Sequence, residues 1–188
     1  MRLGKRRVLA GLILIATWLA AGPLVAAQPG DAYTLTPKET ERLRGSAGAD
    51  THAIMRRAGK RLDRVFRSVV GTYRGKTHPD HARFMALMEG PAERSEIVDG
   101  RFLFVAGNSL KTSEAAAFIL DLVSGQLAMA TLTHERFRYQ TLHIRQMECA
   151  DEELKSAATH RFRDWADAIR QRSGEVDRFP LSRTETPC

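Results

Sequence analysis

The chain has 188 residues, 29 of them basic and 22 acidic, which gives a formal net charge of +7. Four of the basic residues and no acidic ones lie in residues 1–27, so residues 28–188 carry a net charge of only +3. This small excess argues against a nucleic-acid-binding protein. The remaining length, about 160 residues, is that of one domain with its own hydrophobic core.

Residues 1–27 have the pattern of a secretory signal peptide. A basic start from Arg2 to Arg7 precedes an uncharged, mostly apolar run from Val8 to Ala21, and the segment ends in the small residues Ala26-Ala27. An uncleaved anchor is the alternative, because residues 8–27 are almost long enough to span a bilayer. Gly22-Pro23 interrupts the run and favours cleavage. We therefore expect a bacterial periplasmic or secreted protein, without a membrane contact once the signal is removed.

Helical patterns dominate the first half of the domain expected over residues 28–188. Residues 28–35 are expected to be disordered. Thr36 to Glu39 forms a capping box with proline at the first helical position, which predicts a short helix ending at residue 44. A longer helix is predicted between Asp50 and Gly71, and a third from about residue 79 to residue 90.

The second of these helices carries a cluster of basic residues. A solvated helix face is the simpler interpretation, and a functional basic patch is the alternative. The cluster consists of Arg56, Arg57, Lys60, Arg61, Arg64 and Arg67.

Strand patterns follow. The turn at Asp99-Gly100 predicts a hairpin, since Asp-Gly is a strong hairpin signal. The predicted strands are residues 96–98, 102–106, 115–122, 126–133 and 137–144, the last alternating less cleanly. Four or five antiparallel strands, with helices on one side, define an α+β fold flanked by the N-terminal helices and a long C-terminal helix.

The C-terminal helix is predicted over residues 150–171. Its apolar positions recur every three or four residues, with acidic residues at its start and basic residues at its end, as the helix dipole prefers. These positions are Leu154, Ala158, Phe162, Trp165 and Ile169. Packing against the core is the expected role of this stripe, and binding to a membrane or partner is the alternative.

Two cysteines, Cys149 and Cys188, lie on either side of this helix. The helix would be ~33 Å long, and the residues after it reach ~50 Å when extended, so the tail can return to Cys149. An exported protein meets oxidising conditions, and we predict a Cys149–Cys188 disulfide. Free thiols are the alternative. A metal site on the cysteines is disfavoured, because neither has a CxxC partner or a close histidine.

The tightest cluster of possible metal ligands is His78-Pro79-Asp80-His81. His81 is expected to point outward from the first turn of its helix, and no spacing identifies a third ligand among the other histidines. The chain contains no GxSxG, GxxxxGK[ST] or GxGxxG motif. We therefore expect no catalytic residues, metal or cofactor. An envelope hydrolase or metal-dependent enzyme using His78, Asp80 and His81 is the alternative.

A polar loop between the second and third predicted strands is the candidate for partner binding. It has one apolar residue near its centre and is longer than a tight turn, and loops held between rigid strands often carry binding functions. An ordinary solvent loop is the alternative. The candidate residues are Asn108, Ser109, Leu110, Lys111, Thr112 and Ser113.

The hairpin that carries this loop resembles the central hairpin of the Ivy-type inhibitors of vertebrate lysozyme. The resemblance covers residues 99–107, the loop, residues 115–122 and residues 124–126. It implies a small periplasmic protein with an antiparallel sheet flanked by helices, whose protruding loop enters the active cleft of a lysozyme. A lysozyme-like enzyme is therefore the expected protein partner.

The loop differs from the family pattern in its central residues. The family brackets a Pro-His-Asp core with two cysteines, whereas this chain has Asn108 and Ser113 at the bracketing positions and Leu110-Lys111-Thr112 at the core. Without the cysteines the loop is less preorganised, and ordering it costs binding free energy. Lys111 would supply a cation in place of the histidine. The pattern leaves the oligomeric state and the identity of the lysozyme open.

Overall fold

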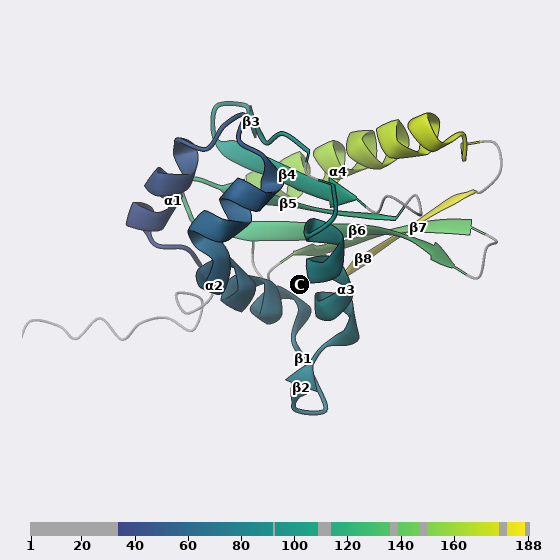
Figure 1. The fold of residues 1–188 in the computed structure, drawn as a ribbon, viewed down its shortest axis with the longest axis horizontal. Helices are drawn as coiled ribbons and strands as arrows, with labels where there is room; N and C mark the ends of the chain where they lie inside the picture. Colours follow the sequence, from purple (N-terminus) through teal and green to yellow (C-terminus); the bar gives the residue numbers. More distant parts are fainter. Residues whose placement is uncertain are drawn as a thin grey trace, which may run out of the picture.

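A six-stranded sheet forms the centre of the protein (Figure 1). The structure is a computed structural model, and it describes residues 34–91, 93–108, 114–135, 139–146, 150–176 and 180–186. The strands follow one another in chain order, and every pair is antiparallel except the parallel pair β7–β8. They are β3 (Glu96–Val98), β4 (Phe102–Asn108), β5 (Ala115–Asp121), β6 (Leu127–Glu135), β7 (Tyr139–Gln146) and β8 (Leu181–Thr186).

The α+β class and the five predicted strands are confirmed, each within about two residues of its expected bounds. The count of four or five strands is too low, because β8 adds a sixth at the edge of the sheet beside β7. A two-stranded hairpin, β1 (Thr72–Tyr73) and β2 (Lys76–Thr77), was also not predicted. In Figure 1 this hairpin projects away from the sheet.

Four helices of the described chain pack on the sheet, and all four agree with the sequence pattern. They are α1 (Pro37–Arg44), α2 (Thr51–Val70), α3 (Pro79–Met88) and α4 (Glu152–Ser173). Their starts are capped as expected: Glu39 accepts a hydrogen bond from the Thr36 backbone N–H at 2.9 Å, and Asp50 accepts one from the Ala53 N–H at 2.6 Å. Within the described ranges, no helix is both long and apolar enough to cross a membrane.

The helices cover both faces of the sheet, so the expectation of helices on one side is wrong (Figure 1). β4 and β5 consist almost entirely of buried residues, and successive side chains of a strand point to opposite faces. Leu103 and Phe118 therefore pack with α1 to α3, while Phe104 and Ile119 pack with α4. Both faces needed a helical cover to remove these apolar side chains from water.

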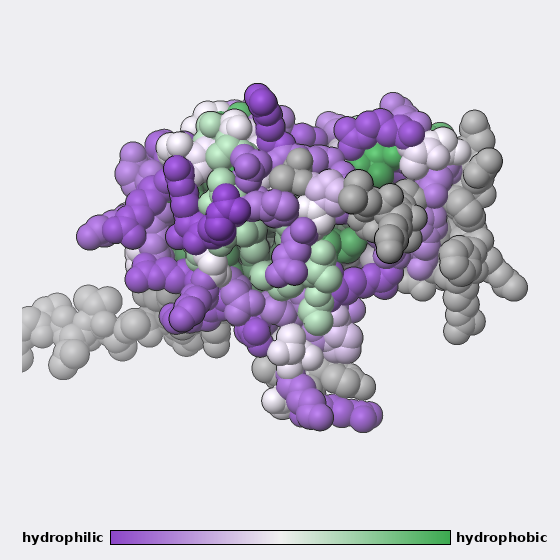
Figure 2. All heavy atoms as spheres, viewed as in Figure 1, coloured by the Kyte–Doolittle hydropathy of each residue, from purple (hydrophilic) through white to green (hydrophobic). Residues whose placement is uncertain are grey.

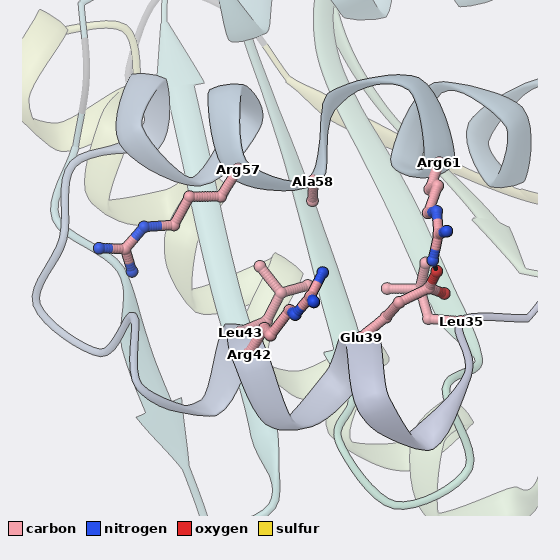
Figure 3. Close-up of a pocket in the computed structure, with 7 residues that line it drawn as sticks. All are labelled: Leu35, Glu39, Arg42, Leu43, Arg57, Ala58 and Arg61. Atoms are coloured by element: carbon pink, nitrogen blue, oxygen red, sulfur yellow. Dashed lines mark ion pairs between the residues drawn. The ribbon is translucent and has the colours of Figure 1, made fainter.

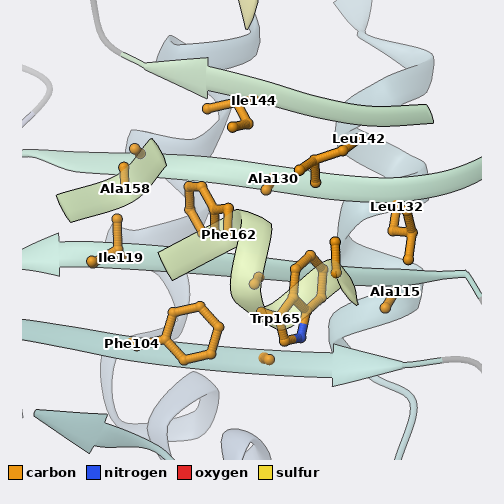
Figure 4. Packing of buried hydrophobic residues seen from close by; sticks show 14 of the residues in the cluster. Phe104, Ala115, Ile119, Ala130, Leu132, Leu142, Ile144, Ala158, Phe162 and Trp165 are labelled. Carbon is orange, nitrogen blue, oxygen red and sulfur yellow. The ribbon is translucent and has the colours of Figure 1, made fainter. Parts of the chain in front are cut away.

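The predicted core stripe of α4 is confirmed. Figure 4 shows Phe162 and Trp165 lying over Phe104, Ile119 and Ala130 of the sheet. Trp165 is only 3% exposed. The centroid of its ring lies 6.4 Å from the ring centroid of Phe104 and 6.5 Å from that of Phe162, and both contacts are edge-on. Such contacts are favourable for aromatic rings.

Leu35 joins the fold, although residues 28–35 were expected to be disordered. Its side chain is buried, and its N–H donates to the Gly125 carbonyl at 3.0 Å. A Cβ atom on Gly125 would lie 2.1 Å from the Leu35 carbonyl oxygen, so this approach requires glycine. The expectation therefore fails at Leu35, while residues 28–33 and the predicted signal peptide lie outside the described residues.

Candidate functional site

The paired strands β4 and β5 carry the two ends of the predicted partner-binding loop. They pair without interruption from Phe102–Asp121 to Asn108–Ala115. Asn108 is the predicted site residue that lies within the described part of the chain. Ser109, Leu110, Lys111, Thr112 and Ser113 lie outside it.

Hydrogen bonds to Glu93 connect the β4 side of the loop to α4. The Glu93 carboxylate oxygen Oε1 accepts from Asn108 Nδ2 at 3.3 Å and from Arg172 Nη2 at 3.1 Å. Arg172 lies in the last turn of α4, and its side chain is 63% exposed. One carboxylate thus joins the end of β4 to the end of a helix on one face of the sheet.

The β5 side of the loop is tied to α3 through Glu114, the residue just before β5. Its carboxylate pairs with Arg83 of α3 and accepts from the His134 backbone N–H of β6 at 3.2 Å. The Glu114 side chain is only 18% exposed, so this ion pair is partly shielded from solvent. We call Arg83, Glu93, Asn108, Glu114 and Arg172 the hairpin end.

Close backbone packing also fixes the hairpin end. A Cβ atom on Gly90 would lie 1.8 Å from the Asn108 carbonyl oxygen, and one on Gly107 would lie 2.7 Å from the Leu87 carbonyl oxygen. The end of α3 therefore lies directly on the backbone of β4. Glycine is required at both positions because any side chain would push the helix and strand apart.

The charges of the hairpin end compensate one another. Arg83 is paired with Glu114, and Arg172 is paired with Glu93. Residues 108–114 contain two charged residues, Lys111 and Glu114, and Glu114 is already neutralised by Arg83. Lys111 is the other charged residue of this sequence segment and lies outside the described residues.

The His78–His81 cluster is divided between separate contacts. His78 caps α3, where its Nδ1 accepts from the Asp80 N–H at 3.1 Å, and the Asp80 carboxylate pairs with Arg145 of β7. His81 was expected to point outward, but it is 3% exposed and its Nε2 lies 3.0 Å from Asp63 Oδ1 of α2. The expectation fails because this side of the first turn of α3 packs toward α2.

The environment of His81 favours its neutral form. Burial lowers the pKa of His81, and the nearby Arg67 lowers it further, while Asp63 partly opposes both. In the part of the chain that the structure describes, no three His, Cys, Asp or Glu side chains are grouped so that they could hold a metal ion. His78 and Asp80 thus lie together at the start of α3, whereas His81 contacts Asp63 of α2.

Cys149 and Cys188 lie outside the described residues, so their disulfide stays a prediction. Sequence reasoning missed the partners that fix the loop ends. Glu93 and Arg172 are 79 residues apart in the chain, and Arg83 and Glu114 are 31 apart. No local spacing connects such pairs, because the folding of the sheet brings them together.

Comparison with known proteins yielded no match: no family model, curated protein or solved structure is significantly similar to this chain. The resemblance to Ivy-type inhibitors therefore depends on the hairpin sequence.

Proposed function

We propose that this chain is an exported, non-enzymatic binding protein that holds a protein partner at the hairpin end. The strongest support is that side-chain contacts hold both ends of the loop. Glu114 forms an ion pair with Arg83 of α3. Asn108 donates to Glu93, which in turn pairs with Arg172 of α4. Two helical layers thus restrain the two ends of one polar segment.

This restraint matters for the free energy of binding. Ordering mobile side chains and backbone subtracts from the binding free energy, so a loop with fixed ends loses less. In the Ivy-type pattern two cysteines bracket the loop. In this chain the pairs Arg83–Glu114 and Glu93–Arg172 restrain the residues at or next to the corresponding positions.

The proposed partner is a lysozyme-like enzyme, on the strength of the hairpin resemblance. Such an enzyme has two carboxyl groups in its cleft. Lys111 supplies the cation that these carboxylates would attract. Removing a cation from a desolvated carboxylate pair costs ~2–5 kcal/mol of binding, because the carboxylates are left unpaired.

The affinity should be modest, because ion pairs hold the loop ends less firmly than a covalent bridge. We expect a dissociation constant of roughly 1–10 µM. Isothermal titration calorimetry of residues 28–188 against a c-type lysozyme tests the proposal. Lys111→Ala should weaken binding by at least about 30-fold.

Two further variants make the test specific to the hairpin end. Arg83→Ala releases Glu114, and should weaken binding by roughly 3–10-fold by loosening one loop end. Arg64→Ala, an exposed residue on α2, should leave the affinity unchanged. Absence of binding at about 100 µM lysozyme, or equal binding by the wild type and Lys111→Ala, would contradict the proposal.

A further inference from the structure

A cavity of about 470 Å³ lies between α1 and α2, and none of its lining residues belongs to the hairpin end (Figure 3). Its apolar lining consists of Leu35, Leu43 and Ala58. Leu43 points from α1 toward α2, and Ala58 points from α2 toward α1, so both helices contribute to the lining (Figure 3). The volume falls within the range of small-molecule pockets, ~300–1,000 Å³.

Three arginines stand around this apolar lining: Arg42, Arg57 and Arg61. Arg42 extends from α1 into the space between the helices (Figure 3), and no partner is found for it among the described residues. Arg57 donates from Nη1 to the Ser46 hydroxyl at 2.9 Å, and in Figure 3 its guanidinium group points away from Arg42, so only its stem lines the cavity.

One carboxylate, that of Glu39, also lines the cavity, and it pairs with Arg61. The Glu39 side chain is 12% exposed, whereas that of Arg61 is 61% exposed. The Glu39 carboxylate therefore neutralises the guanidinium group of Arg61, one of the three arginines that line the cavity. One uncompensated positive charge, that of Arg42, is therefore directed into the cavity.

The charge of the two helices extends this positive character beyond the cavity. α1 and α2 contain nine basic and three acidic residues, a net charge of +6, whereas residues 28–188 together carry +3. The rest of that segment is therefore net negative. Figure 2 shows hydrophilic side chains gathered over α1 and α2. Such a concentration of one sign attracts anions to this face.

We propose that the α1–α2 cavity binds a single amphiphilic anion, with an alkyl chain against the apolar lining and a carboxylate or phosphate head on Arg42. The planar guanidinium group forms paired hydrogen bonds with both kinds of head group. The apolar lining selects for a ligand with a tail, since a bare anion would leave that surface uncovered. This site is independent of the proposed binding at the hairpin end.

Glu39 offers a specific test of the proposal, because its negative charge repels an anionic ligand. Glu39→Gln removes that charge and frees Arg61, yet glutamine can keep the capping hydrogen bond to the Thr36 N–H. The substitution should therefore tighten anion binding without disturbing α1. A merely structural role for the Arg61–Glu39 pair predicts no such gain.

The experiment is a calorimetric titration of residues 28–188 with dodecanoate below its micelle concentration, beside acetate and the uncharged dodecyl maltoside. Dodecanoate should bind at least about tenfold more tightly than either control ligand. Arg42→Gln should weaken dodecanoate binding about tenfold, and Glu39→Gln should strengthen it several-fold. Arg64→Gln, on the same basic helix but outside the cavity lining, should change neither value. Unchanged thermal unfolding verifies that each variant is folded.

Three results would overturn the proposal. Acetate binding as tightly as dodecanoate would show a bare anion site, and dodecyl maltoside binding as tightly would show an unspecific apolar surface. Binding that occurs on phosphatidylglycerol vesicles and not to monomeric dodecanoate would show a membrane-surface contact instead.

Discussion

Arg101 and Asp121 form a bidentate ion pair. They lie at the open end of the β4–β5 pair, opposite the end that carries the loop. Arg101 Nε donates to Asp121 Oδ1 at 2.9 Å, and Nη2 donates to Oδ2 at 2.6 Å. The Asp121 carboxylate is fully buried, and it also accepts from the Val123 N–H and the Ser124 hydroxyl. Burial raises the pKa of Asp121, but these hydrogen bonds outweigh it and hold the pKa at about 2.

Asp121 should make the protein sensitive to acid. Its pKa is about 2 in the folded state against 3.8 for an ordinary aspartate, so the contribution of Asp121 to folding stability is fully present above about pH 5 and is lost as the pH falls toward 2. The loss should be about 2–3 kcal/mol. Urea unfolding at pH 2–6 measures it. Asp121→Asn should flatten this dependence, whereas Asp164→Asn, on the exposed side of α4, should keep it.

His81 should add a second pH dependence at higher pH. Because burial lowers its folded-state pKa below the ordinary 6.5, the unfolded state binds protons first as the pH falls. The contribution of neutral, buried His81 to stability is therefore fully present above about pH 7 and declines as the pH falls through 6.5. The free energy of unfolding of His81→Gln should not decline between pH 7 and pH 5.5. A decline of the same size in wild type and variant would refute the assignment, and His160→Gln, at an exposed position, is the control.

Trp165 should contribute strongly to stability. Trp165→Ala should lower the free energy of unfolding by ~3–5 kcal/mol, because it leaves a cavity between α4 and the sheet. Trp165→Phe should cost less, since the indole Nε1 has no hydrogen-bond partner among the described residues. Chemical denaturation of both variants measures the difference. Equal losses would mean that the indole nitrogen has a partner.

Gly90 should be intolerant of any side chain. Gly90→Ala places a Cβ atom against the Asn108 carbonyl oxygen, and should cost about 1–3 kcal/mol while displacing the end of β4. Gly45→Ala is the matched control, because its Cβ atom would meet nothing within 4 Å. Thermal unfolding of the two variants compares them. A Gly90→Ala protein as stable as Gly45→Ala would show that α3 can move away from β4.

Local patterns were sufficient to predict the helices and five of the six large-sheet strands. β8 was missed because Leu181–Thr186 contains one strongly apolar residue in a polar tail, and an edge strand needs little burial to pair. The two-sided cover of the sheet was missed although Phe102 to Ala106 is an unbroken apolar run, which is typical of a strand buried on both faces.

The candidate site was less accessible to sequence reasoning. Asn108 was expected in the loop, but it is the last residue of β4, and the pairs Glu93–Arg172 and Arg83–Glu114 depend on the packing of α3 and α4 against the sheet. His81 was misjudged because a first-turn residue of a helix faces either solvent or a neighbouring helix according to how the helices pack. That packing is a tertiary property without a local signature.

Amide hydrogen exchange of residues 28–188, with and without a saturating c-type lysozyme, tests the central claim most directly. The account predicts that lysozyme slows exchange in the segment joining β4 to β5 and in the adjoining ends of both strands. It predicts no slowing in α1 and α2. Protection confined to α1 and α2, or no protection anywhere in the chain, would contradict partner binding at the hairpin end.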